Sequence, residues 1–228
     1  MIKCKNITVM NIENAINGMR NPMKSWIKSD SEWCYHTKAA YDCKHCPLIE
    51  SCVNGYMKED GGYILGENDL KLAKSLIKAG TDERKFLRQI FISIDITAPL
   101  FWWKEMDTYK VATVSNSTST MHKLTDERLT FTDFSMENCL DTCGAFLDIL
   151  IPQCEYLRQQ YIETGDKRYW RALIEILPES FNQTRTWTAN YETLRNIYHA
   201  RKNHKLDEWK EFCKIIETLP YAKELICE

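Results

Sequence analysis

The stretch RQIFISIDITAPLFWWKEMDTYKVATVSNSTSTMH, residues 88–122, decides the fold. Its first part has isoleucine at every second position from residue 90 to residue 96, which is the period of a strand with one buried face. Pro99 follows, and proline is well tolerated in the first turn of a helix. We therefore predict a strand, then an aromatic-rich helix over 99–110, then a hydroxyl-rich loop over 111–120.

The flanking segments predict an α+β protein in which helices dominate the second half. Upstream we expect a strand over 7–10, a helix from about Ile12, and a helix that Asn68 or Asp69 caps and Gly80 ends. Downstream, apolar residues at helical spacing predict a long amphipathic helix from Leu140 to Tyr161. Shorter helices are expected at about 167–177, 189–202, 207–218 and 220–227.

Composition excludes several classes of protein. The 8 glycines and 6 prolines among 228 residues are too few for a collagen-like, mucin-like or proline-rich disordered chain. The net charge of −2 gives no overall basic character, so nucleic acid is not expected as a partner through wholesale electrostatic binding, and a local basic patch is the alternative. No apolar run reaches the roughly 20 residues that span a bilayer, and the N-terminus does not read as a signal peptide. We therefore expect a cytoplasmic protein that does not bind membranes.

Ten cysteines are many for such a chain, and four of them are clustered. Cys34, Cys43, Cys46 and Cys52 have the spacing C-x8-C-x2-C-x5-C, which suits a tetrahedral metal site, and His36 could replace Cys34. We interpret residues 31–65 as a Cys-rich insert held by a structural zinc, because a segment this short and polar cannot bury enough apolar surface to order itself. An iron–sulfur cluster and unliganded thiols are the alternatives. The insert separates residues 1–30 from residues 66–228, which together form the main domain.

The order of strand, Pro99, aromatic helix and hydroxyl-rich loop resembles the flavin-dependent thymidylate synthases. In that family the helix ends in Arg-His-Arg, and the pattern continues close to R-H-R-x-x-S-x-N-x-x-S-x-R-Y. Thr108, Tyr109 and Lys110 take the Arg-His-Arg positions, and Thr113 and Thr118 take the two serines. A second stretch, LPESFNQTRTWTANYETLRNIYHAR over 177–201, resembles the family's late segment.

The resemblance implies an antiparallel sheet, a homotetramer and active sites shared between subunits. It implies that each site binds FAD with dUMP stacked on the flavin, while methylenetetrahydrofolate supplies carbon and NADPH supplies hydride. The positions that would bind cofactor are Thr108, Tyr109, Lys110, Asn190 and Asn196. The positions that would bind substrate are Lys110, Thr113, Ser117, Thr118, Arg185 and Arg201. No side chain is expected to act as a catalytic group.

The chain also departs from the family at charged positions. Thr108 and Thr120 stand in place of arginines, whose planar guanidinium groups bind phosphates through paired hydrogen bonds. Gln89 replaces a histidine, Glu105 a glutamine and Glu192 an arginine. Two hypotheses follow. The chain is a divergent enzyme that carries out FAD-mediated methylation, or a related C5 modification, of a pyrimidine deoxynucleotide. Alternatively, it is a non-catalytic nucleotide-binding or interaction protein with a zinc module.

Overall fold

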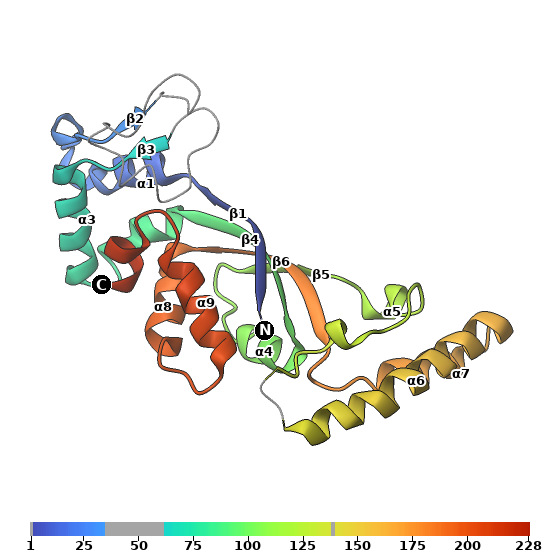
Figure 1. Cartoon of the computed structure of the whole chain (residues 1–228). Helices are drawn as coiled ribbons and strands as arrows, with labels where there is room; N and C mark the ends of the chain where they lie inside the picture. The colour runs from blue at the N-terminus through green and yellow to red at the C-terminus, as the bar shows by residue number, and fades with distance from the viewer. Residues whose placement is uncertain (1, 35–61, 138–139) are drawn as a thin grey trace, which may run out of the picture. The chain divides into compact units, whose positions relative to one another are not determined.

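The computed structural model describes residues 2–34, 62–137 and 140–228 (Figure 1). Contacts divide the chain into two units that interleave along the sequence. Unit 1 comprises Met1–Lys5, Asp95–Lys110 and Ser115–Trp187. Unit 2 comprises Asn6–Ile94, Val111–Val114 and Thr188–Glu228. The predicted boundaries of the Cys-rich insert stay predictions, because residues 35–61 lie outside the described residues.

A four-stranded antiparallel sheet supplies strands to both units, and the protein is α+β as predicted. The strand order is β1-β4-β6-β5, with bounds Lys3–Met10, Phe91–Pro99, Asn182–Asn190 and Val114–Ser117. Strand β4 confirms the predicted alternation, because Ile92, Ile94 and Ile96 are at most 2% exposed while the residues between them are not buried. Strand β6 was not expected, and β5 lies inside the predicted loop.

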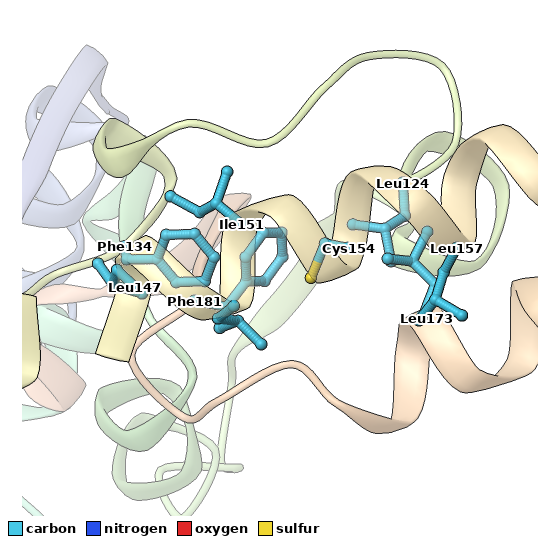
Figure 2. Packing of buried hydrophobic residues seen from close by; sticks show 9 residues of the cluster. Leu124, Phe134, Leu147, Ile151, Cys154, Leu157, Leu173 and Phe181 are labelled. Carbon is cyan, nitrogen blue, oxygen red and sulfur yellow. The ribbon is translucent and has the colours of Figure 1, made fainter. Parts of the chain in front are cut away.

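Unit 1 contains the helices α4 (Leu100–Met106), α5 (Thr120–Lys123), η5 (Phe131–Asp133), α6 (Asp141–Thr164) and α7 (Lys167–Glu175). The predicted helix over 99–110 therefore ends four residues early, at Met106. Helix α6 confirms the long amphipathic helix and ends at Gly165, whose φ of 68° favours glycine. One face of α6 packs into a core that draws on both flanking segments (Figure 2). The core residues are Leu124, Phe134, Leu147, Leu150, Ile151, Cys154, Leu157, Leu173 and Phe181.

Unit 2 contains most of the remaining elements. Its helices are α1 (Ile12–Met19), η1 (Asn21–Met23), η2 (Trp26–Lys28), α3 (Glu67–Ala79), η4 (Arg84–Gln89), α8 (Tyr191–Arg201), α9 (Asp207–Glu217) and the π-helix η6 (Lys223–Cys227). A small antiparallel pair, β2 (Glu32–Cys34) and β3 (Gly62–Ile64), stands at the two ends of the segment that is not described. Trp209, Phe212 and Leu225 are almost fully buried here. The predicted helices over 189–202, 207–218 and 220–227 correspond to α8, α9 and η6.

The start of α3 differs from the prediction. Gly66 is the N-cap residue, and the side chain of Asp30 accepts hydrogen bonds from the backbone of Asn68 and Asp69. Because Asp30 binds the N-terminus of the helix, the Asp69 carboxylate can take part in a buried network instead. It accepts hydrogen bonds from Arg20, at 2.5 Å, and from the hydroxyls of Ser29 and Ser31. Burial alone would raise the pKa of Asp69, but these hydrogen bonds together hold it below its ordinary value.

Among the described residues, no helix is both long enough and apolar enough to cross a membrane.

Candidate functional site

The guanidinium of Arg185, on β6 in unit 1, is held on three sides. Its Nε donates to Oε1 of Gln183 at 2.9 Å, and its Nη1 donates to Oδ1 of Asp107 at 2.8 Å. Its Cζ lies 4.2 Å from the centre of the Trp103 ring, a cation–π contact. The Trp103 indole is itself fixed, because it is 1% exposed and donates to the backbone oxygen of Gln183. Arg185 is therefore oriented before any ligand arrives.

Gln183 links this arginine to the hydroxyl-rich segment. Its Nε2 donates to the backbone oxygen of Thr118 at 3.0 Å, while its Oε1 accepts from Arg185. The backbone N–H of Thr118 donates to the oxygen of Thr184 at 2.9 Å. Two predicted substrate residues, Arg185 and Thr118, are thus joined through one side chain within unit 1.

A pocket of about 170 Å³ opens next to Thr118. Three consecutive hydroxyl residues form part of its wall, and Leu124, Leu129 and Phe181 give it an apolar side. The charged lining residues are Lys123, Glu127, Arg128 and Asp133. Two positive and two negative side chains leave the lining without a dominant charge, and Lys123 is also paired with Asp126 at 2.7 Å. Such a pocket suits an uncharged polar group better than a bare phosphate.

The three residues at the Arg-His-Arg positions follow Asp107 directly at the end of α4. Thr108 is exposed, and its hydroxyl donates to the backbone oxygen of Glu105 at 2.7 Å. Tyr109 is half-buried and Lys110 is exposed. Within the described residues the Lys110 ammonium has no ion-pair partner, so it remains available to an anion. Ser117 is exposed on β5.

The other predicted residues lie in unit 2. Asn190 is 3% exposed and caps α8, with its side-chain oxygen accepting from the backbone N–H of Thr193 at 2.9 Å. Asn196 is exposed on α8, and Thr113 is half-buried. Arg201, at the end of α8, lies with its Cζ 4.7 Å from the Trp209 ring centre and its Nη1 3.0 Å from Nε2 of His204. The structure therefore divides the predicted set between the two units.

Sequence reasoning missed several residues that organise these positions. Asp107 and Gln183 orient Arg185, yet neither is one of the positions that the resemblance assigns to cofactor or substrate. Glu192 was noticed only as a lost arginine, whereas it forms a two-pronged ion pair with Arg84. The Nε–Oε2 and Nη2–Oε1 distances are both 3.0 Å, and the side chains are only 18% and 9% exposed. The Glu192 carboxylate is thus paired with a guanidinium from η4.

The predicted metal ligands Cys43, Cys46 and Cys52 lie outside the described residues, and the Cys34 side chain is not described either. Across residues 2–34, 62–137 and 140–228 no group of three or more metal-ligating side chains gathers. The zinc site therefore stays a prediction. Cys154 and Cys213 are buried, and burial raises the pKa of each thiol to about 11. Both are packing residues of the buried core.

The fold as a whole is that of the flavin-dependent thymidylate synthases, which confirms the fold expected from the resemblance. The similar structures include ThyX from Helicobacter pylori complexed with FAD and dUMP, with a TM-score of 0.65, 16% identity and coverage of 99% of this chain and 97% of that one. A second structure of the Helicobacter pylori enzyme with FAD and dUMP has a TM-score of 0.66, 16% identity and coverage of 99% and 96%. No protein-family model matches the chain, and no curated protein matches it.

Proposed function

We propose that the chain is a divergent flavin-dependent thymidylate synthase-like enzyme that methylates, or otherwise modifies at C5, a pyrimidine deoxynucleotide such as dUMP. The observation that carries this proposal is the end-to-end correspondence with enzymes that bind FAD and dUMP, over 99% of this chain and 97% of one of theirs. The pre-oriented Arg185 supports it, because the motif places that residue among the substrate contacts. Divergence at 16% identity is consistent with an altered substrate.

The proposed substrate contacts follow from the charged and hydroxyl groups that the chain carries at the positions named by the resemblance. Arg185 supplies a fixed guanidinium, and Lys110 supplies an exposed ammonium for a phosphate. Ser117 and Thr118 bring hydroxyl groups next to β6 within unit 1, whereas Thr113 and Arg201 belong to unit 2 and are proposed from the resemblance alone. Hydroxyl and backbone N–H groups can replace part of the lost cationic contacts.

For a bound flavin, the resemblance leaves a reduced set of candidate contacts, which lie in unit 1 at Tyr109 and Lys110 and in unit 2 at Asn196. Lys110 and Asn196 are exposed and keep their side-chain donors, and the half-buried Tyr109 offers a ring face. Thr108 and Asn190 instead make hydrogen bonds to nearby backbone groups. We therefore propose that these two residues stabilise the local backbone and do not contact the flavin directly. FAD would supply hydride transfer from NADPH, with methylenetetrahydrofolate as the carbon donor. The chain's own residues would bind and orient the substrate, in a cytoplasmic homotetramer.

A non-catalytic nucleotide-binding or interaction protein on the same fold is the second candidate. The altered charged positions favour it, because Thr108, Thr120, Gln89 and Glu192 stand where the family carries residues that contact flavin or phosphate. The two candidates differ in flavin chemistry and not in nucleotide binding.

The test is turnover by the purified full chain. With FAD, NADPH and methylenetetrahydrofolate present, dUMP should be converted to a C5-modified product that mass spectrometry detects. Arg185→Ala should lower kcat/KM by at least tenfold, since it removes a charge-assisted hydrogen bond. Arg171→Ala, which removes an exposed arginine on α7 with its Glu175 pair, is the control and should keep wild-type turnover. Nucleotide binding without flavin-dependent turnover would select the second candidate.

A further inference from the structure

In the Asp107–Arg185 ion pair, each side chain has a polar atom that takes no part in the pair's hydrogen bond. The pair uses Oδ1 of Asp107 and Nη1 of Arg185, and Gln183 occupies the Nε of Arg185. Among the described residues, Oδ2 of Asp107 and Nη2 of Arg185 have no hydrogen-bond partner. One hydrogen-bond acceptor and one donor therefore belong to the same fixed ion pair.

This ion pair differs from the exposed Asp166–Arg168 pair of the same unit. The Arg185 side chain is 15% exposed and lies on a buried tryptophan, whereas Arg168 in its pair with Asp166 is 90% exposed. Asp107 itself is 53% exposed, so a ligand can reach its carboxylate. A rigid donor beside an accessible acceptor can discriminate between hydrogen-bonding patterns, whereas a mobile surface pair does not.

We infer that Asp107 and Arg185 together recognise the imide edge of a pyrimidine-2,4-dione, as in uracil. That edge presents a ring N3–H beside a carbonyl oxygen, which complements the carboxylate acceptor and the guanidinium donor. Cytosine presents an unprotonated N3 at the same place, which would face the carboxylate without a proton between them. The inference rests on the proposed function, because it assumes that Arg185 meets the pyrimidine, and it assigns base selection to Asp107.

Neutralisation of Arg185 points to the same conclusion. A guanidinium already paired with a carboxylate gains less from a phosphate than a free guanidinium does. The phosphate of the nucleotide would then be left to Lys110, while Arg185 contacts the base. Asp107 is accordingly a specificity-determining residue that also positions Arg185.

The experiment is equilibrium dialysis of dUMP and dCMP against the wild-type chain and Asp107→Asn, each with and without FAD. The two nucleotides share the sugar and phosphate, so a difference in Kd between them reports the base edge. Wild type should bind dUMP roughly tenfold more tightly than dCMP, as expected for one hydrogen bond to a charged group. In Asp107→Asn, the amide can still accept from Arg185 but now donates towards N3, so the preference should fall or invert towards dCMP. Asp166→Asn makes the same change in an exposed Asp–Arg pair and should keep the wild-type preference.

A purely structural role of Asp107 makes a different prediction. Loss of structure would weaken both nucleotides equally and leave their ratio unchanged, which would overturn the inference. Equal binding of the two nucleotides by wild type, or binding of neither, would overturn it as well. Arg185→Lys, which keeps the charge but loses the planar fork, is the second variant and should lower the selectivity ratio without unfolding the chain. Flavin uptake is measured in the same samples, so failure of base selection in a flavin-binding protein contradicts this inference alone.

Discussion

Replacement of Arg20 by alanine should strongly destabilise unit 2. The Arg20 and Asp69 side chains are 4% and 0% exposed, so this change leaves a buried carboxylate without its charged partner. Breaking such a pair costs about 3–5 kcal/mol. For a chain of this size each kcal/mol shifts Tm by roughly 2–4 °C, so we expect a loss of roughly 6–20 °C. Two serine hydroxyls still bind Asp69, which favours the lower part of that range.

The assay is thermal unfolding followed by circular dichroism, with Lys74→Ala as the matched control. Lys74 lies on the same helix, α3, and pairs with Glu228, but both side chains are exposed, so its loss should change Tm little. A Tm for Arg20→Ala equal to that of Lys74→Ala would refute the reasoning.

The same network predicts a dependence on pH. The folded pKa of Asp69 lies below its ordinary value of 3.8, so its contribution to stability is present above that value and is lost as the pH falls through the folded pKa. Asp69→Asn should therefore flatten the acid side of the stability curve relative to wild type.

Two further sets of substitutions test the local assignments. Arg84→Ala and Glu192→Ala should each lower the free energy of unfolding, and the double variant should lose about 0.5–3 kcal/mol less than the sum; strict additivity would mean that the pair in unit 2 is not formed. Asn190→Ala should cost about 1 kcal/mol through loss of the α8 cap, and Asn190→Asp should restore it. If Asn190→Asp restores stability but abolishes flavin binding, the residue contacts the cofactor and is more than a cap.

The elements that were predicted correctly are those whose signals are local. The alternation of isoleucines in β4 and the apolar spacing of α6 each need only a short window of sequence. Strand β6 was missed although Thr184, Thr186 and Thr188 recur at every second position, because its apolar residues are few.

The candidate site shows where sequence reasoning ends. Arg185 was found because a motif contains it, whereas Asp107, 78 residues away, is recognisable only once the helix end and the strand are placed in space. Asp30 caps α3 across 38 residues and replaces the local caps that the sequence offers. Long-range pairing of this kind depends on the tertiary fold, so no single window of sequence carries it. Asn190 was found by its motif, yet its contact is a local cap.

Flavin uptake by the purified protein tests the central claim most directly. We expect added FAD to be retained at about one molecule per chain after gel filtration, with its fluorescence quenched. The uptake should weaken in Lys110→Ala and Asn196→Ala and remain unchanged in Lys74→Ala. A chain that retains no FAD at high micromolar concentration, while folded by circular dichroism, would contradict the enzyme proposal.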